Sequence, residues 1–330
     1  MPNTTAEDRG LTIRQAQPDE LEAAAALYID ADRALARFSR ALLVDPAEED
    51  RTGEAQEAAD DLAALVCTET DTVLLAFGDG PEPVGMAGVV VRGRHAHITY
   101  LFVHPGWQGH GIGRALLDQL RAHIAAAGCN VTSLHASRDP RALQRYLRYG
   151  LHPAPPMISL VTSRPSFPDL DLRDGLDAHP LQADNANDAA LIATVGDIDA
   201  VVRGVRRPAD LRRWLEDGAQ GAMLTRRGTA IPVGYYLCAL TKNGRRGDIG
   251  PAAAIDVERI PAMLARALAG AATLPGAPAA EWWVHLPGEN SGALPPLFAA
   301  GFQARQLTSY LATGPIGVWD RYVFHDADML

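Results

Sequence analysis

The most informative stretch of this sequence covers residues 97–113 and reads His97-Ile-Thr-Tyr-Leu-Phe-Val-His-Pro-Gly-Trp-Gln-Gly-His-Gly-Ile-Gly113. An apolar run that ends at Val103 predicts a strand, and the amphipathic pattern after Gly113 predicts a helix. The glycine loop between them would bring backbone N–H groups and the positive end of a helix dipole together, which is a combination that binds anionic pyrophosphate. Glycine permits the close approach because it has no Cβ. The stretch therefore predicts a strand-loop-helix unit with a pyrophosphate site.

Two other phosphate-binding loops do not fit these residues. A Walker loop requires Lys followed by Ser or Thr after its last glycine, whereas Arg114-Ala115 stands there. The Rossmann fingerprint has the spacing G-x-G-x-x-G and an acidic residue about twenty positions later. Here the glycines are Gly109, Gly111 and Gly113, and no matching acidic residue follows. The plain alternative is an ordinary glycine-rich turn between a strand and a helix.

The order Gln108-x-x-Gly111-x-Gly113 after an apolar strand resembles the acyl-CoA loop of the GNAT N-acetyltransferases, whose pattern is Gln/Arg-x-x-Gly-x-Gly/Ala. The flanking residues 100–105 and 112–117 also look like that family. The resemblance implies an α/β fold (α+β, with a mixed sheet). It also implies an acetyltransferase that moves an acetyl group from acetyl-CoA to a primary amine by direct attack in a ternary complex. Acetyl-CoA would be the co-substrate, and no metal would be needed.

The resemblance further assigns roles in binding the coenzyme. Strand residues 101–103 would pair with the amides of the pantetheine arm as an added strand does, and one strand amide would face the thioester oxygen. The loop would hold the pyrophosphate, with Arg114 as an added cation and His110 as a solvent-facing spacer. Ser137-Arg138-Asp139 replaces the family's asparagine, so this contact would differ. The residues expected at the coenzyme are Leu101, Phe102, Val103, Gln108, Gly109, His110, Gly111, Ile112, Gly113, Arg114 and Asp139.

Two residues are candidates for proton transfer. The segment 142–151 is similar to the family's Leu-Tyr-x-x-x-Gly-Phe, which makes Tyr146 the expected general acid toward the leaving thiolate; the alternative is a packing aromatic. His97 stands where some GNAT enzymes have a glutamate base, and histidine has a suitable resting pKa for that task. The alternative for His97 is a residue that, with His95, only flanks the edge of a strand.

The two halves of the chain repeat one plan. Pro83-Val-Gly85 and Pro232-Val-Gly234 each begin the second strand of a predicted hairpin, 149 positions apart. Gly150 and Gly301, which each end a predicted helix, are 151 positions apart. Near-constant offsets predict tandem copies of one domain rather than two unrelated α/β domains. The expected organisation is a catalytic GNAT domain at 1–162, a polar and proline-rich linker at 163–178, and a second GNAT-like domain at 179–330.

The second copy lacks the features that carry chemistry in the first. Asp256 and Glu258 stand near the expected loop position, where they would repel a pyrophosphate, and the loop has no glycines. Leu297, four residues before Gly301, cannot donate a proton. The second copy is therefore expected to be degenerate and non-catalytic. Trp319 and Tyr322, near the C-terminus, could close over either copy.

Composition and charge limit the remaining possibilities. The chain has 330 residues, of which 47% are hydrophobic and 21% charged, as is typical of globular proteins of two domains. A net charge of −10 argues against a nucleic-acid partner, because phosphate binding needs a basic face. No apolar run is long enough to span a membrane, and the polar start lacks a signal-peptide core. Cys67, Cys129 and Cys238 show no ligand spacing. We expect a cytoplasmic protein without a membrane partner.

The acceptor amine is less well specified. An acidic segment at 45–61 predicts either a solvated surface or a lid that attracts a small cationic molecule or a basic peptide. Two alternative functions are a non-catalytic CoA-binding sensor or scaffold of the same fold, and an enzyme that uses a longer acyl group or another acyl chemistry.

Overall fold

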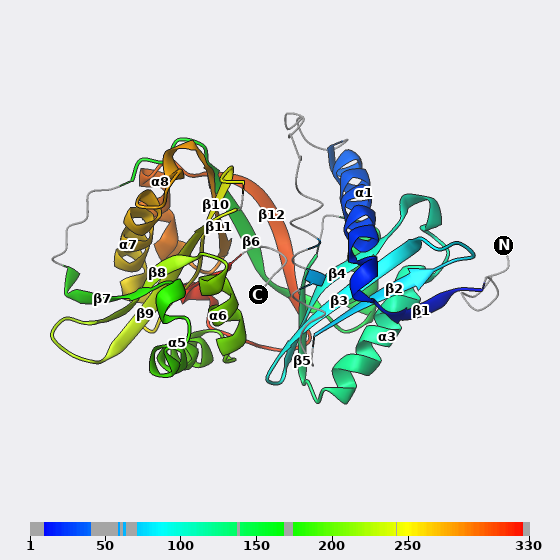
Figure 1. Ribbon diagram of the computed structural model, residues 1–330, viewed down its shortest axis with the longest axis horizontal. Coiled ribbons are helices and arrows are strands. Elements are labelled where there is room, and N and C mark those ends of the chain that lie inside the picture. The colour runs from blue at the N-terminus through cyan, green and yellow to red at the C-terminus, as the bar shows by residue number, and fades with distance from the viewer. Residues whose placement is uncertain are drawn as a thin grey trace. The chain divides into compact units, whose positions relative to one another are not determined.

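The computed structural model describes residues 10–40, 59, 62–63, 71–136, 139–167, 174–241 and 243–325. The chain divides into two compact units (Figure 1). Unit 1 comprises Met1–His152 together with Leu311–Gly314, and unit 2 comprises Pro153–Tyr310 together with Pro315–Leu330. Within the described ranges, no helix is both long and apolar enough to cross a membrane.

Unit 1 is a mixed sheet with helices. Its strands follow the order β1-β2-β3-β4-β5, in which β4 and β5 are parallel and the other neighbours are antiparallel. The strands are β1 (Thr12–Gln15), β2 (Thr72–Phe77), β3 (Pro83–Arg92), β4 (His95–Val103) and β5 (Val131–Ala136). The helices are α1 (Leu21–Arg40), α3 (Ile112–Ala126) and α4 (Pro140–Arg148).

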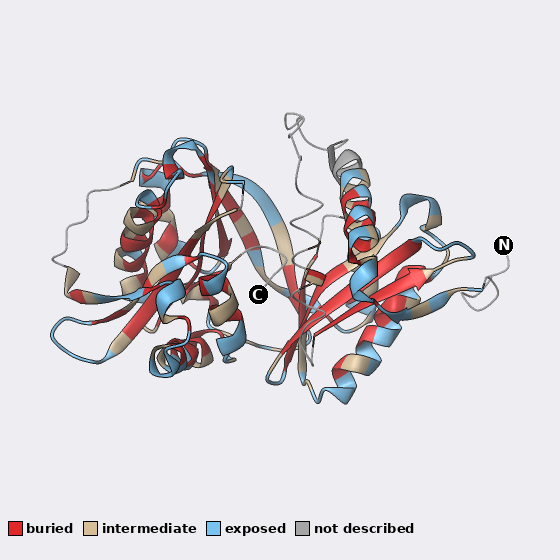
Figure 2. Cartoon of the chain, viewed as in Figure 1, coloured by how far each residue is buried: buried red, intermediate tan, exposed pale blue. Residues whose placement is uncertain are grey.

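Two helices of unit 1, α3 after Gly113 and α4 before Gly150, form where the sequence predicts them. In α3, residues Leu116, Leu117, Leu120 and Ile124 are buried against the sheet. Both α1 and α3 contact β3, and β3 is buried at every position except its last (Figure 2). Since successive strand residues point to opposite faces, helices cover both faces of the sheet.

Unit 2 repeats this architecture. Its strand order is β12-β6-β11-β10-β9-β8-β7, with β13 paired to β10. The strands are β6 (His152–Thr162), β7 (Leu176–Leu181), β8 (Gln220–Arg226), β9 (Pro232–Leu240), β10 (Arg246–Ala254), β11 (Glu281–Pro287), β12 (Gln303–Ala312) and β13 (Tyr322–Val323). The helices are α5 (Ala189–Val202), α6 (Pro208–Glu216), α7 (Ile260–Ala272) and α8 (Leu294–Ala299).

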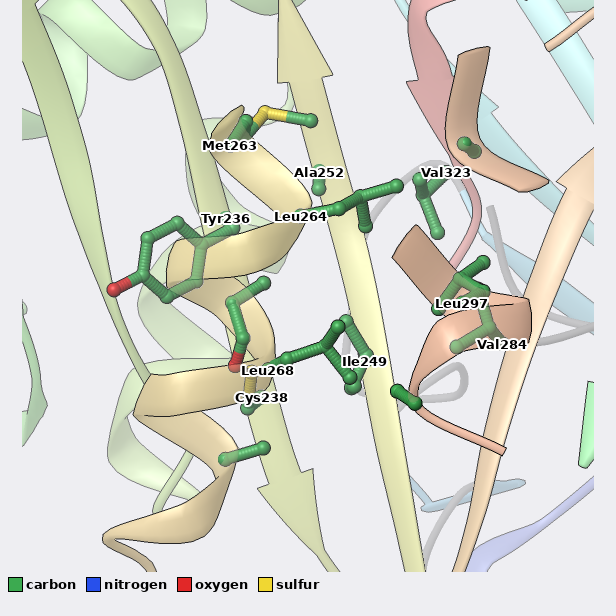
Figure 3. Packing of buried hydrophobic residues seen from close by; sticks show 14 of the residues in the cluster. Tyr236, Cys238, Ile249, Ala252, Met263, Leu264, Leu268, Val284, Leu297 and Val323 are labelled. Atoms are coloured by element: carbon green, nitrogen blue, oxygen red, sulfur yellow. Dashed lines mark hydrogen bonds between the residues drawn. The ribbon is translucent and has the colours of Figure 1, made fainter. Parts of the chain in front are cut away.

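A packed apolar cluster joins α7 to the sheet of unit 2. Figure 3 shows Leu264 and Leu268 of α7 beside Ala252 and Ile249 of β10, and Val284 of β11 lies in the same cluster. The predicted hairpins of both copies are present as β2–β3 and β8–β9.

The boundary between the units differs from the domain limits predicted from sequence. The strand β6, which lies inside the predicted limits of the first copy, pairs with β11 from Thr162↔Trp282 to Met157↔Pro287 and belongs to unit 2. In return, Thr313 belongs to unit 1, where its N–H donates to Thr132 O at 2.9 Å. The unit boundary therefore follows His152, before the predicted linker, because a strand belongs to the sheet that satisfies its backbone hydrogen bonds.

Candidate functional site

The two parallel strands at the centre of unit 1 separate part-way along their length. Pairing between β4 and β5 covers His95↔Val131 to Ile98↔Leu134 and ends there. The register between β3 and β4 shifts at the same place, so that Thr99 is the extra residue of a bulge. Residues 99–103 continue as a strand on β3 alone. Within the described residues, no strand pairs with the other edge of this segment, so it can accept an extended ligand by strand addition.

The glycine loop follows this open segment directly. Pro105–Trp107 form a short 3-10 turn, and the side chain of Gln108 donates to Val103 O at 3.3 Å. Gly109 and Gly111 have φ values of 84° and 83°, a left-handed conformation that favours glycine, and no atom lies within 4 Å of a Cβ built on either residue. The loop is therefore shaped by its glycines and leaves open space around them.

The helix α3 begins directly after Gly111, which is its N-cap residue. Its first-turn N–H groups and its dipole therefore point toward the loop. Arg114 is exposed and its Nε lies 3.7 Å from Asp118 Oδ2. His110 is partly exposed, and its Nδ1 lies 3.1 Å from Trp107 O. This loop holds the predicted coenzyme residues 108–114 together at one end of β4.

One cation at this helix start was not predicted. The guanidinium of Arg145, from α4, occupies the space that a Cβ at position 113 would need, and Val103 also contacts that space. The Arg145 side chain makes neither a hydrogen bond nor an ion pair within the described part of the chain. No local sequence signal could reveal it, because its approach to Gly113 depends on how α4 packs against α3.

The two tyrosines of α4 differ in their surroundings. Tyr146 is 7% exposed within the apolar cluster of unit 1, and burial raises its pKa to about 12. Its hydroxyl makes no hydrogen bond to the residues that the structure describes. In contrast, the hydroxyl of Tyr149 donates to Asp118 Oδ1 at 2.6 Å. The Tyr149 hydroxyl is thus committed to Asp118, whereas the Tyr146 hydroxyl is neutral and has no hydrogen-bond partner among the described residues.

Asp139 has a local structural role. It is the N-cap of α4, and its Oδ1 accepts from the backbone N–H of Arg141 at 2.8 Å. Burial raises its pKa, but the hydrogen bonds from Arg141 outweigh this effect and hold the pKa below its ordinary value. The carboxylate therefore starts the helix that carries Tyr146. Its contact with coenzyme stays a prediction, and Ser137 and Arg138 lie outside the described residues.

His97 lies inside the sheet. Its side chain is completely buried, and its Nδ1 is 2.8 Å from Ser133 Oγ, which also contacts His95 Nε2 at 2.6 Å. His135 packs edge-on to His97 with ring centroids 5.5 Å apart. This location agrees better with a histidine that holds β4 and β5 together than with an exposed base, and the catalytic role stays a prediction.

The equivalent region of unit 2 is built differently. Only residues 255–259 separate β10 from α7, whereas residues 104–111 separate β4 from α3. The short connection contains Asp256 and Glu258 and no glycine. Leu297 is completely buried in the unit 2 core. The structure thus contains the glycine loop in unit 1 alone, among the residues it describes. The acidic segment 45–61 falls outside those residues, apart from Ala59.

Comparison with known proteins defines the class. Residues 37–151 match the acetyltransferase (GNAT) family. A putative acetyltransferase from Pyrococcus horikoshii has the same fold over 97% of this chain and 96% of its own, with 19% identity and a TM-score of 0.70. A GCN5-related N-acetyltransferase from Sphaerobacter thermophilus aligns over 94% and 96%, with 18% identity and a TM-score of 0.62.

A tandem GNAT protein from the clavulanic acid biosynthesis pathway aligns over 92% of this chain and 99% of its own, with 15% identity and a TM-score of 0.61. The curated protein sequences give no match. The chain thus has the two-domain architecture of tandem GNAT proteins. Residues 37–151 match the acetyltransferase (GNAT) family, and the whole chain shares the fold of these solved proteins. The fold class predicted from sequence is confirmed.

Proposed function

We propose that this protein is an acetyl-CoA-dependent N-acetyltransferase whose single active site lies in unit 1. The observation that carries the proposal is the separation of β4 from β5 after Ile98, directly beside a left-handed glycine loop at the start of α3. A strand edge suits the pantetheine amides, and a helix start suits the pyrophosphate. Bound acetyl-CoA would supply an activated acetyl thioester.

The residues present fit such a coenzyme. Gly109 and Gly111 leave space where side chains would collide with a phosphate, and α3 directs its first N–H groups there. The Arg145 guanidinium adds a positive charge beside Gly113 with no carboxylate to neutralise it among the described residues. We therefore add Arg145 to the expected pyrophosphate ligands, in the part that sequence reasoning gave to Arg114.

Tyr146 is the general acid of this proposal. Burial keeps its hydroxyl protonated at neutral pH, with a pKa of about 12, and the absence of a described hydrogen-bond partner leaves the proton available to the leaving sulfur. The main-chain N–H groups of residues 101–103 can stabilise the thioester oxygen. Because His97 is completely buried, we propose that the amine loses its proton to a water molecule and not directly to His97.

We propose that the acceptor is a primary amine on a small cationic molecule or a peptide. The net charge of −10 supports attraction of a cation and disfavours nucleic acid. We propose that unit 2 does not catalyse. Its short acidic connection offers no phosphate cradle, and Leu297, at the position that corresponds to Tyr146, cannot donate a proton.

The test has two steps. Calorimetry measures binding of CoA and acetyl-CoA to the full chain, and a thiol assay then measures CoA release over a panel of primary amines. Binding with thiol release on at least one amine supports the proposal. Binding without release across the panel would indicate a CoA-binding scaffold, and no binding would overturn the proposal altogether.

A further inference from the structure

The central strands of unit 2 separate at the same place as those of unit 1. Parallel pairing of β10 with β11 covers Arg246↔Glu281 to Asp248↔Trp283 and ends there, and the register of β10 on β9 shifts immediately afterwards. Gly85 pairs with Val103 in unit 1, and Gly234 pairs with Ala254 in unit 2. Ala252 and Ala253 are therefore the counterparts of the strand residues expected to hold pantetheine in unit 1.

In unit 2 this open edge is already paired. The C-terminal strand β13 runs antiparallel to β10, with Ala252↔Val323 and Ala253↔Tyr322. On the other side, Phe324 forms a bridge with His285 of β11, and its N–H donates to His285 O at 3.0 Å. The segment thus satisfies backbone groups of both separated strands, as an added peptide strand would.

One face of β13 belongs to the apolar core. Val323 is completely buried in the cluster that contains Ala252, Leu264 and Val284 (Figure 3). On the other side, Phe324 is 1% exposed and stacks on Trp319 with ring centroids 5.2 Å apart. These contacts hold the segment by burial of large aromatic surfaces.

The opposite face is held by a buried polar network. The hydroxyl of Tyr322 accepts from Arg207 Nη2 at 2.5 Å, and Arg207 Nε donates to Asp199 Oδ2 at 2.8 Å. Tyr235 donates to Asp199 Oδ1 at 2.6 Å. The backbone is also fixed, because Asn290 Nδ2 donates to Tyr322 O at 2.8 Å. Tyr322 and Arg207 are each at most 1% exposed.

The close fit extends to the bulge of β10. A Cβ at Gly250 would overlap the carbonyl oxygen of Phe324, so only glycine admits the segment at this distance. In addition, Arg321 Nη1 donates to Ile255 O at 2.7 Å at the start of the short connection to α7. The C-terminal segment therefore covers the site that corresponds to the strand edge and the loop of unit 1.

We infer that the segment Trp319–Phe324 is a built-in occupant of the coenzyme groove of the second copy, so that the chain binds one coenzyme molecule, in unit 1. The inference rests on the proposed function for the identity of the ligand, but the pairing of β13 on β10 is independent of it. The groove of the second copy is thus filled by the chain's own C-terminal strand, which pairs with β10.

Hydrogen exchange on the wild-type chain tests this inference. Without coenzyme, peptides that cover 250–255 should exchange slowly, and peptides that cover 99–104 should exchange faster. With coenzyme at about 100 times its Kd, local opening at 99–104 should slow by up to about 100-fold, whereas 250–255 should not change. Calorimetry should give a stoichiometry of one coenzyme molecule bound per chain.

Each contrary result has a distinct meaning. Fast exchange at 250–255 without coenzyme, protection of that peptide by coenzyme, or a stoichiometry of two would overturn the inference. Failure of coenzyme to protect 99–104 would overturn the proposed function, while slow exchange at 250–255 would still support the closed groove.

A matched pair of variants tests whether Phe324 holds the C-terminal segment in the groove of unit 2. Phe324→Ala should speed exchange at 250–255 by at least about tenfold and leave the Kd of unit 1 for CoA within about twofold. Phe302→Ala removes a phenylalanine of similar burial from the apolar cluster of unit 2, outside the segment Trp319–Phe324. If both variants raised exchange at 250–255 equally, Phe324 would have no specific anchoring role. If Phe324→Ala fails to fold, the wild-type exchange measurement still decides.

Discussion

The Arg145 guanidinium and Gly113 share one space at the start of α3, since a Cβ on residue 113 would collide with Nη1 of the arginine. Glycine at this position therefore lets a cation from α4 reach the N-terminus of α3. The charge lies where the proposed pyrophosphate would bind, and the described residues offer it no carboxylate.

Removal of this charge should weaken coenzyme binding. Because a hydrogen bond to a charged group contributes about 1.5–3 kcal/mol, we expect Arg145→Leu to raise the Kd for CoA by about tenfold or more. Arg148→Leu is the matched control, since this exposed arginine also lies in the last turn of α4. Arg145→Leu should weaken the binding of dephospho-CoA by the same factor as the binding of CoA. If only CoA binding is weakened, Arg145 contacts the 3′-phosphate and not the pyrophosphate.

The glycine loop allows a second test with a built-in control. Gly111 and Gly128 both have left-handed φ values and open space around a Cβ, but they lie at opposite ends of α3. Asp enters this conformation more readily than most residues, so Gly111→Asp and Gly128→Asp should cost similar stability. Only Gly111→Asp should abolish stabilisation by acetyl-CoA in a thermal melt, because its carboxylate repels the pyrophosphate. Equal stabilisation of the two variants would contradict the loop assignment.

The role of Tyr146 can be separated from that of its neighbour. Tyr146→Phe should lower kcat by about 10²–10⁴-fold, the usual contribution of a general acid, with the Kd for CoA little changed. Tyr149→Phe should keep most of the activity, because that hydroxyl is committed to Asp118. Steady-state kinetics with an amine identified in the thiol assay gives both values. Full kcat in Tyr146→Phe would show a packing role only.

Burial of Tyr146 also predicts a dependence of stability on alkaline pH. Its pKa is about 12 in the folded chain, against 10.0 for an ordinary tyrosine, because burial disfavours the charged form. Below pH 10 the group is neutral in both states, so its contribution to stability is fully present. That contribution is lost as the pH rises from 10 through 12, since only the unfolded state ionises readily.

The full loss is on the order of 3 kcal/mol, from about 1.4 kcal/mol per pKa unit. Denaturant unfolding at pH 8 to 11 should therefore show a smaller decline for Tyr146→Phe than for the wild type. Parallel pH curves would mean that the Tyr146 hydroxyl is hydrated in the folded state.

His97 calls for a test that distinguishes structure from catalysis. Because its ring contacts Ser133 inside the sheet, we expect His97→Gln to lower the free energy of unfolding by about 1–3 kcal/mol. The shape of the acid limb of the kcat/KM profile should not change. His152→Gln, at an exposed position, controls for loss of a histidine. Disappearance of the acid limb in His97→Gln would instead establish His97 as the base.

The strand-loop-helix unit, the repeat and the resemblance to the GNAT family could all be predicted from the sequence. These features are local or periodic: glycine spacing fixes where the backbone can turn left-handed, and apolar periodicity fixes which face of α3 is buried. The register of Tyr146, four residues before Gly150, is local as well. For the same reason, the missing loop in the second copy was visible as Asp256 and Glu258.

Tertiary structure decided everything that depends on contacts between distant residues. The domain limit predicted at residue 162 places β6 in the first copy, but β6 pairs with β11 and belongs to unit 2. His97 is buried because its strand, β4, is paired with β3 on one side and with β5 on the other. Tyr322 could have covered either copy by sequence; the separation of β10 from β11 leaves backbone groups that need partners, and β13 supplies them.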